Sequence, residues 1–182
     1  MIAAFEESGA FLDGHFQLAS GRHAARYVEK FNLLQWPDRT AEICARLAEA
    51  ARGLEAETVA GPTTGGVILA YEMARQLGVR GIIAERRPDG PGRAIQRDFR
   101  LSPGERVLIA DDVVTSGGSV HDTIEAVREA GGKPVGVTVL VDRSSGRADF
   151  GLPFFAAATL EIESWEPADC PLCPKGVPLT IT

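Results

Sequence analysis

The feature that most constrains the fold is the run Val-Leu-Ile-Ala-Asp-Asp-Val-Val-Thr-Ser-Gly-Gly-Ser at residues 107–119. Its apolar start, Val107–Ala110, shows no polar alternation, which is typical of a strand buried on both faces in a parallel sheet. We expect this strand to end at Asp111 and Asp112. The small residues that follow, Thr115–Ser119, then form a turn that opens a helix. Ligands of such sheets bind beyond the carboxyl ends of the strands, so the two acids mark a candidate site.

The rest of the chain repeats a strand–helix alternation on both sides of this run. Apolar patterns predict strands at 58–60, 79–84 and 134–141, and helices at 2–10, 37–53, 67–77 and 120–130. Alternation of this kind predicts an α/β fold with a mostly parallel central sheet flanked by helices. We expect one domain over residues 1–182, with a core at about 36–149. The segments 1–35 and 150–182 do not fit the core pattern and together predict a small hood lobe.

The segment 85–103 is polar and has no dependable period. Its charged residues include Glu85, Arg86, Arg87, Arg93, Arg97 and Arg100. A structureless stretch of this length inside a compact domain is typical of a functional lid or of a flexible surface loop. We expect a lid, because an anionic ligand at the neighbouring site needs cations.

Composition narrows the classes of function. The chain has 182 residues, a net charge of −6 and 45% hydrophobic residues, and its basic residues are almost all arginine. The negative charge argues against a nucleic-acid partner, which needs a basic face. We find no apolar stretch long enough for a membrane span and no basic-then-apolar leader, and therefore expect no membrane partner and a cytoplasmic location.

The run at 107–119 also indicates a chemistry. Free amides and the helix dipole make a small-residue turn before a helix a natural phosphate cradle. Carboxylates beside such a cradle make sense when a sugar lies between them, because they accept hydrogen bonds from vicinal hydroxyls. The alternative is an ordinary strand–turn–helix junction with capping Ser and Thr residues. The Gly-x-x-x-x-Gly-Lys-Ser/Thr pattern of a P-loop is absent, so triphosphate hydrolysis is not indicated.

This run resembles the phosphoribosyl pyrophosphate (PRPP) motif of the type I phosphoribosyltransferases, in which two acids hold the ribose hydroxyls and the loop holds the 5-phosphate. The N-terminal segment Phe16-Gln-Leu-Ala-Ser-Gly21, followed by Tyr27, is similar to a segment of the orotate phosphoribosyltransferases. The tail Cys170-Pro-Leu-Cys173 looks like the short bacterial branch of that family. The resemblance covers about residues 14–176.

The resemblance implies a type I phosphoribosyltransferase-like fold and a set of site residues. It implies PRPP contacts from Arg86, Arg87, Thr63, Thr64, Gly65, Asp111, Asp112, Val113, Val114, Thr115, Ser116, Gly117, Gly118 and Ser119. It implies orotate contacts from Ser20, Gly21, Thr115 and Arg143, and a catalytic set of Asp111, Asp112, Arg87 and Arg93. A guanidinium such as that of Arg143 can hold the carboxylate of orotate with two hydrogen bonds.

The activity implied is a glycosyltransferase (pentosyltransferase) reaction of pyrimidine biosynthesis. Ribose 5-phosphate would pass from PRPP to orotate, with Mg²⁺ as cofactor bound mainly through substrate oxygens. The resemblance also implies a homodimer with a shared active-site loop. Two alternatives stay open: a transferase for a purine or another base, and a PRPP-sensing regulator that binds nucleic acid.

The chain departs from the family pattern at three places where a lysine is common. It has Ala19 before the Ser-Gly pair, Thr64 in the pyrophosphate turn and Gly90 at the ungapped position of the mobile-loop lysine. Arg93 or Arg97 could supply the missing loop cation. These departures remove three expected lysines and leave the PRPP motif untouched.

The cysteines are three: Cys44, Cys170 and Cys173. Cys44 falls in a helical pattern and is expected in the core. Cys170 and Cys173 have the spacing of half a zinc site. We find no second ligand pair in the chain, so we expect a plain turn of the tail, with a metal shared across a dimer as the alternative.

Overall fold

The computed structural model describes residues 2–182, with side chains from Phe5 onward. Five parallel strands and one antiparallel edge strand form the central sheet, in the order β5-β4-β3-β6-β7-β8, and a second sheet has the order β10-β1-β2-β9. The elements are α1 (Ile2–Glu7), β1 (Phe11–Gln17), β2 (His23–Val28), α2 (Phe31–Leu34), α3 (Pro37–Ala51), η1 (Arg52–Leu54), β3 (Thr58–Pro62), α4 (Gly65–Leu77), β4 (Arg80–Arg86), β5 (Arg93–Ile95), β6 (Arg106–Val114), α5 (Gly118–Glu129), β7 (Lys133–Asp142), β8 (Phe154–Thr159), β9 (Ser164–Trp165), η2 (Pro167–Asp169) and β10 (Thr180–Ile181).

Strand β6 lies inside the central sheet, between β3 and β7, and pairs in parallel with both. Its apolar residues pack into separate clusters of the core. Leu108 and Ala110 join the core built with α3 and α4, whereas Ile109 joins the core that contains Val120 and Ile124 of α5. Helices thus cover both faces, which explains the unbroken apolar run and confirms the predicted α/β sheet.

The expected end of this strand at Asp111 is wrong. β6 continues to Val114, and its last residues pair with β7 through Val113↔Val141 and Val114↔Asp142. The ladder continues because β7 runs alongside for its whole length, so the two acids are held in regular sheet backbone. The turn is therefore shorter than expected, and α5 begins at Gly118.

The segment 85–103 is not structureless throughout. β4 extends to Arg86, and β5 pairs with it in antiparallel fashion through Arg86↔Arg93. A polar loop at 87–92, rich in Gly and Pro, closes this hairpin, and the Arg87 amide donates to the Gly92 carbonyl over 3.2 Å. A short antiparallel edge strand has too few residues to show a period, which is why the pattern concealed it.

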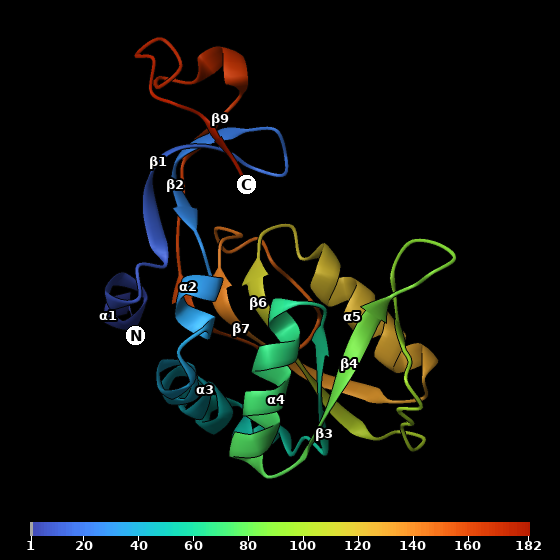
Figure 1. Cartoon of the computed structure of the whole chain (residues 1–182). Helices are drawn as coiled ribbons and strands as arrows, with labels where there is room; N and C mark the ends of the chain where they lie inside the picture. The colour runs from blue at the N-terminus through green and yellow to red at the C-terminus, as the bar shows by residue number, and fades with distance from the viewer. Residues whose placement is uncertain (1) are drawn as a thin grey trace.

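The second sheet is built from both ends of the chain, but part of the segment 150–182 expected in the hood belongs to the central sheet. Residues 154–159 form β8, which pairs in parallel with β7 and extends the central sheet. The hood proper is the four-stranded sheet of β1, β2, β9 and β10. It stands above the carboxyl ends of β6 and β7, so the ends of the central strands face it (Figure 1).

Among the residues that the structure describes, none of the helices has the length and apolarity needed to span a lipid bilayer.

Candidate active site

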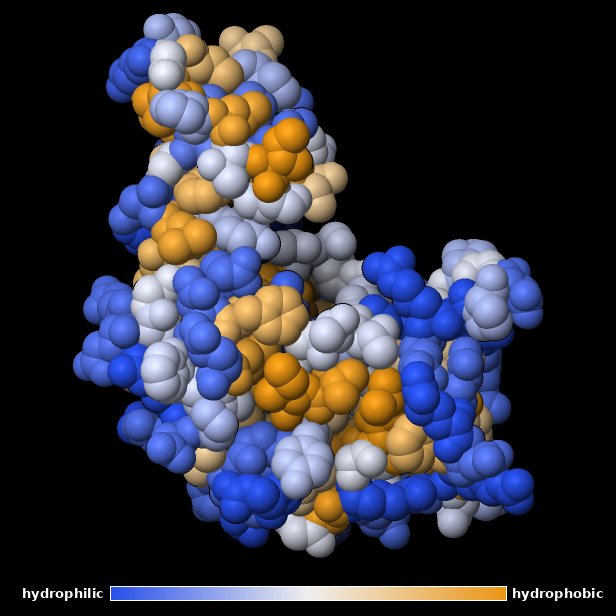
Figure 2. Space-filling view, in the orientation of Figure 1, coloured by the Kyte–Doolittle hydropathy of each residue, from blue (hydrophilic) through white to orange (hydrophobic). Residues whose placement is uncertain are grey.

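Two cavities flank the carboxyl end of β6. The first, of about 380 Å³, is lined by Lys30, Phe31, Thr63, Thr64, Gly65, Asp111, Asp112, Val113 and Ser119. The second, of about 960 Å³, lies under the hood, and its lining includes Ser20, Tyr27, Thr115, Ser116 and Arg143. Figure 2 shows the surface hollowed between the hood and the hydrophilic tip of the β4–β5 hairpin. Residues predicted from the motif, from the β3–α4 turn and from the N-terminal segment thus line cavities at the same strand end.

The acid pair is held rigidly in the first cavity. Asp111 is 4% exposed, and its Oδ1 accepts the Asp112 amide over 2.8 Å. Burial, with the neighbouring Asp112 charge, raises the pKa of Asp111 to about 6. Burial also raises the pKa of Asp112, against the opposing charge of Lys30. Two buried carboxylates of this kind need hydroxyl, cation or metal partners, which a sugar phosphate and its counterion supply.

Lys30 also lines the first cavity, and the sequence analysis did not predict it. Its Nζ lies 3.6 Å from Asp112 Oδ2, and its side chain also lies over the ring of Phe31. It reaches the acids from the link between β2 and α2, far away in sequence. The available signal was its rarity, since Lys30 is one of three lysines in the chain. It places a cation beside the acid pair in a chain that lacks the family's other lysines.

The turn between β3 and α4 packs so closely that only glycine fits at key positions. A Cβ on Gly65 would lie 1.9 Å from Asp112 Oδ2, and a Cβ on Gly61 would lie 2.0 Å from the Gly66 carbonyl oxygen. The turn therefore lies directly against the acid pair. Thr63, Thr64 and Gly65 all line the first cavity, where the resemblance places the pyrophosphate.

The loop after β6 forms the entry to α5. Gly117 caps this helix with φ of +81°, and a Cβ there would lie 3.0 Å from the ring of Phe150. The twelve-residue helix directs its N-terminal amides toward this loop. Ser119 lines the first cavity, while Thr115 and Ser116 line the second. Val113 and Val114 pair with β7, so they contribute to the site chiefly through position.

Arg93 lies beneath the loops rather than at their surface. It is 7% exposed, and its guanidinium donates to Thr63 Oγ1, Thr63 O, Ala84 O and Ser119 Oγ over 3.0–3.2 Å. Burial lowers its pKa, and the Asp111 charge opposes this shift. Because it joins the β3–α4 turn to the start of α5, its position suits holding these two loops together.

The other arginines of the segment 85–103 that were predicted as candidate cations lie in or next to the β4–β5 hairpin. Arg86 and Arg87 border a cavity of about 420 Å³ that also includes Gly118, Ser119 and Asp122. Arg87 forms an ion pair with Glu129 of α5 and donates from Nε to the Arg93 carbonyl over 3.0 Å. Arg97 makes two hydrogen bonds to Glu85, of 2.9 and 2.8 Å. Arg86 and Arg87 therefore flank the α5 end of the site.

Arg143 carries the strongest sign of an anionic ligand in the second cavity. It follows β7, and its amide donates to the Val114 carbonyl over 2.8 Å. Burial lowers the pKa of its guanidinium, which shares the cavity lining with Ser20 and Tyr27. Its buried Nε has no hydrogen-bond partner among the residues that the structure describes. Such a donor favours a ligand carboxylate. Gly21 follows Ser20 in the hood turn, where its amide donates to the Leu18 carbonyl.

A parallel sheet with acids and a phosphate cradle at one strand end characterises a phosphoribosyltransferase, and the sequence model of the "Phosphoribosyl transferase domain" matches residues 32–161. An orotate phosphoribosyltransferase of Pelotomaculum thermopropionicum is 47% identical over 98% of this chain and 93% of its own length. One of Thermotoga maritima is 42% identical over 95% and 91%. The crystal structure of the Aeropyrum pernix orotate phosphoribosyltransferase has a TM-score of 0.70 at 29% identity, covering 86% of this chain and 92% of that one.

The chain belongs to the orotate phosphoribosyltransferase family. The resemblance seen in the sequence is thereby confirmed, together with the fold class and the pentosyltransferase class of enzyme. The near-full-length relatives favour this family over a transferase for another base and over a nucleic-acid-binding regulator. The roles of the individual site residues stay predictions.

Proposed function

We propose that this protein transfers ribose 5-phosphate from PRPP to a ring nitrogen of orotate, giving orotidine 5-monophosphate and pyrophosphate in pyrimidine synthesis. One observation carries the proposal: the acid-lined cavity and the Arg143-lined cavity meet at the end of β6. A sugar at the first and a carboxylate-bearing base at the second would meet over the same strand end. We call the Arg143-lined cavity the base cavity. Residues 1–182 would then act as one catalytic domain, because residues of the core and of the hood both line the base cavity.

The sugar end of the reaction would be held at β6. Asp111 and Asp112 would accept hydrogen bonds from the two ribose hydroxyls. The loop Thr115–Ser119 and the N-terminus of α5 would hold the 5-phosphate through backbone amides. Arg93 supports this arrangement from below through its bonds to Thr63 and Ser119. We regard Arg93 as a positioning residue whose loss would displace both loops.

The pyrophosphate end would lie over the β3–α4 turn, near Thr63, Thr64 and Gly65. Lys30 and the hairpin residues Arg86 and Arg87 provide the nearby cations. The donor set also fits Mg²⁺, because Asp111 and Asp112 present carboxylate oxygens, the ligands that this hard ion prefers, beside the expected substrate oxygens. When bound, Mg²⁺ neutralises charge on the leaving pyrophosphate. Most of its ligands would be substrate oxygens.

The base would lie under the hood. Arg143 would bind the orotate carboxylate, and its partnerless Nε provides one of the two hydrogen bonds. Ser20, Gly21 and Thr115 would contact the polar edges of the ring. A purine or uracil has no carboxylate, so it would leave the buried guanidinium unpaired, and this gives the site its preference.

The chemical step would be a substitution at the anomeric carbon. The bond from this carbon to the pyrophosphate oxygen breaks, the bond to the orotate nitrogen forms, and the proton of that nitrogen passes to the released pyrophosphate or to solvent. Positive charge develops on the ribose as pyrophosphate leaves, and Asp111 and Asp112 would stabilise it electrostatically. Lys30, Arg86 and Arg87 would stabilise the opposite charge on pyrophosphate. Closure of the loop 87–92 would exclude water, which would otherwise hydrolyse PRPP.

We further propose a homodimer and a cytoplasmic location. Large apolar side chains are exposed in α2, in the link between α2 and α3, and in α4: Phe31, Trp36, Ile68 and Tyr71. Figure 2 shows apolar surface over α4, which a second copy of this chain would cover. The family resemblance implies that a hairpin arginine reaches the partner's site. The three free cysteines support a reducing compartment.

The test is a substrate panel. The purified enzyme, PRPP and Mg²⁺ are incubated with orotate, uracil, adenine or hypoxanthine, and nucleotide products are separated by chromatography. We expect orotidine 5-monophosphate and pyrophosphate in equal amounts, and at least a hundredfold lower kcat/KM with every base that lacks the carboxylate. Comparable turnover of a base without a carboxylate would contradict the proposal.

A further inference from the structure

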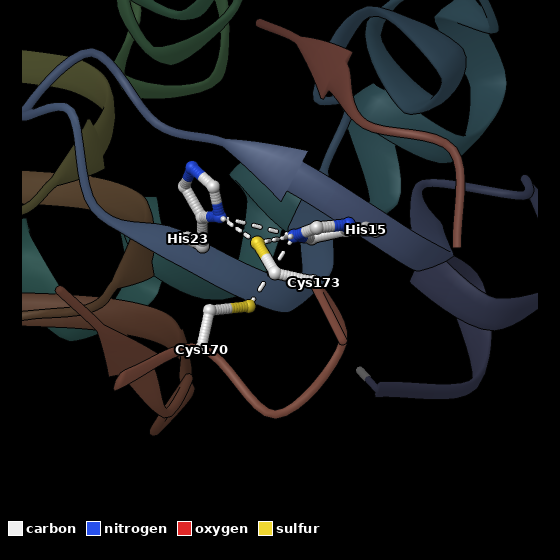
Figure 3. Close-up of side chains that lie close together, drawn as sticks. All are labelled: His15, His23, Cys170 and Cys173. Atoms are coloured by element: carbon white, nitrogen blue, oxygen red, sulfur yellow. Dashed lines mark hydrogen bonds between the residues drawn. The ribbon is translucent and has the colours of Figure 1, made fainter. Parts of the chain in front are cut away.

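The hood contains a cluster of metal-ligating side chains that do not line either of the two proposed substrate cavities. His15 of β1, His23 of β2, Cys170 and Cys173 place their donor atoms within 4.8 Å of one another. Figure 3 shows the two imidazoles pointing from neighbouring strands toward the sulfur atoms of the tail. We call this set the His–Cys cluster. It corrects the sequence expectation that Cys170 and Cys173 lack a second ligand pair.

The spacing within the cluster matches one small ion. Tetrahedral Zn²⁺, with bonds of about 2.0–2.1 Å to nitrogen and about 2.3 Å to sulfur, puts two nitrogens about 3.3 Å apart and a nitrogen and a sulfur about 3.6 Å apart. His15 Nε2 lies 3.0 Å from His23 Nδ1, 3.3 Å from Cys170 Sγ and 3.7 Å from Cys173 Sγ. Cys173 Sγ lies 3.4 Å from His23 Nδ1. These distances are close to the edges of that tetrahedron.

The orientation of His15 supports the same reading. Its Nδ1 lies 2.9 Å from the Val177 carbonyl oxygen, a contact in which the ring nitrogen must donate. The neutral ring then presents an unprotonated Nε2 to the cluster. Histidines that bind metals are commonly oriented by such a bond from the other ring nitrogen. His15, His23 and Cys170 are at most 6% exposed, so water does not readily satisfy them.

We propose that His15, His23, Cys170 and Cys173 bind one structural Zn²⁺ ion. Two thiolates balance the charge of the ion, and mixed nitrogen and sulfur ligands suit zinc better than magnesium or calcium. All four positions are occupied by protein, which is the arrangement of a structural site rather than a catalytic one. The ligands come from both ends of the chain, so the ion ties the tail to the β1–β2 hairpin.

The hood has few interactions of its own to stabilise it. Its strands β9 and β10 have two residues each, and few hood side chains are buried. A lobe with so small a core is usually stabilised by a metal or a disulfide. The tail also carries Thr182 beside Ser164 in the lining of the base cavity. Zinc would therefore hold the roof of that cavity, although the site itself is independent of the proposed reaction.

Metal analysis tests the proposal directly. The full chain is made without a metal-affinity tag, equilibrated with Zn²⁺ under reducing conditions and dialysed, and its metal content is measured by mass spectrometry. We expect about one zinc per chain. Cys173→Ser and His23→Gln should lower the zinc content at least tenfold. Cys173 is exposed, so its serine variant should fold, and circular dichroism checks this.

Matched controls separate the cluster from cysteine and histidine content in general. Cys44→Ala and His121→Gln change residues outside the cluster and should keep about one zinc per chain. Cobalt in place of zinc should give the visible absorption of a tetrahedral thiolate complex in the wild type, and lose it in Cys173→Ser.

Three results would overturn the inference. The folded, reduced wild type could hold less than about a tenth of an equivalent of zinc after equilibration. Cys173→Ser and His23→Gln could retain zinc as the controls do. Mass mapping of the protein from a reducing cytoplasm could find a Cys170–Cys173 disulfide. None of these measurements uses PRPP or orotate, so this inference and the proposed function fail separately.

Discussion

The end of β6 and the hood are held together by different means. β6 pairs in parallel with β3 and β7, with one register shift between Val107 and Leu108, and its residues Val107–Ala110 are at most 1% exposed. The hood has a small core, short strands and side-chain links between distant segments. In the proposed function, the rigid sheet would position the groups for the sugar phosphate, whereas the hood would form a separately stabilised roof for the base. Variants in the two regions should therefore fail in different ways.

The sharpest test of the rigid region is Asp112→Asn. We expect kcat to fall about 10²–10³-fold, because one charge facing the ribose is lost while shape is kept. Burial raises the pKa of Asp112 in the wild type, so removing the charge of this carboxylate should not lower thermal stability. Steady-state kinetics and a melting curve measure both effects, with the exposed Asp38→Asn as control. Near-normal turnover in Asp112→Asn would remove the acid pair from the mechanism.

Arg143→Ala tests the boundary between the two regions. Losing a charge-assisted bond to the carboxylate costs about 1.5–3 kcal/mol, which raises the KM for orotate about 10- to 100-fold. The KM for PRPP should change far less. Initial rates at varied orotate and varied PRPP give both constants, and Arg128→Ala on the exposed face of α5 is the matched control. Equal effects on the two substrates would contradict the assignment of the base cavity.

The buried Asp111 predicts a pH dependence of PRPP binding at the end of β6. Its pKa is raised to about 6, so the folded state holds the proton more tightly than the unfolded chain, and charging Asp111 costs stability as pH rises from about 4 to 6. The ionised form is the better acceptor for ribose hydroxyls. PRPP affinity should therefore rise about three- to tenfold between pH 5 and pH 7.

Calorimetric titration of PRPP at several pH values measures this rise, and Asp111→Asn should flatten it. The stability advantage of Asp111→Asn over the wild type should also shrink as pH falls from 7 toward 4. An affinity that rises equally in the variant would assign the pH effect to another group.

The smallest effect is expected in the hood. Arg22 donates to Ser164 Oγ over 3.0 Å and to Ser164 O over 2.5 Å, and pairs with Glu166. Arg22→Ala should cost about 1 kcal/mol of stability, since the group is partly exposed. Arg26→Ala removes only an exposed pair with Asp13 on the same hairpin and should cost less. Chemical denaturation compares the two, and a larger loss in Arg26→Ala would reverse the ranking.

The end of β6 could be predicted from the sequence more completely than the hood could. The buried strand, the acids and the β3–α4 turn follow from short contiguous patterns, because one strand and its turns place them. Lys30, β8 and the His–Cys cluster depend on contacts between segments distant in the chain. His15 and His23 also lack the close spacing of a familiar zinc motif. β5 is too short to show a period, so the hairpin could not be distinguished from a loop.

A crystal structure of the protein with PRPP and orotate tests the central claim most directly. The account predicts ribose hydroxyls within hydrogen-bond distance of Asp111 and Asp112, the 5-phosphate on the Thr115–Ser119 amides, and the orotate carboxylate on Arg143. Clear density for the sugar phosphate away from the end of β6, or for the carboxylate away from Arg143, would contradict it.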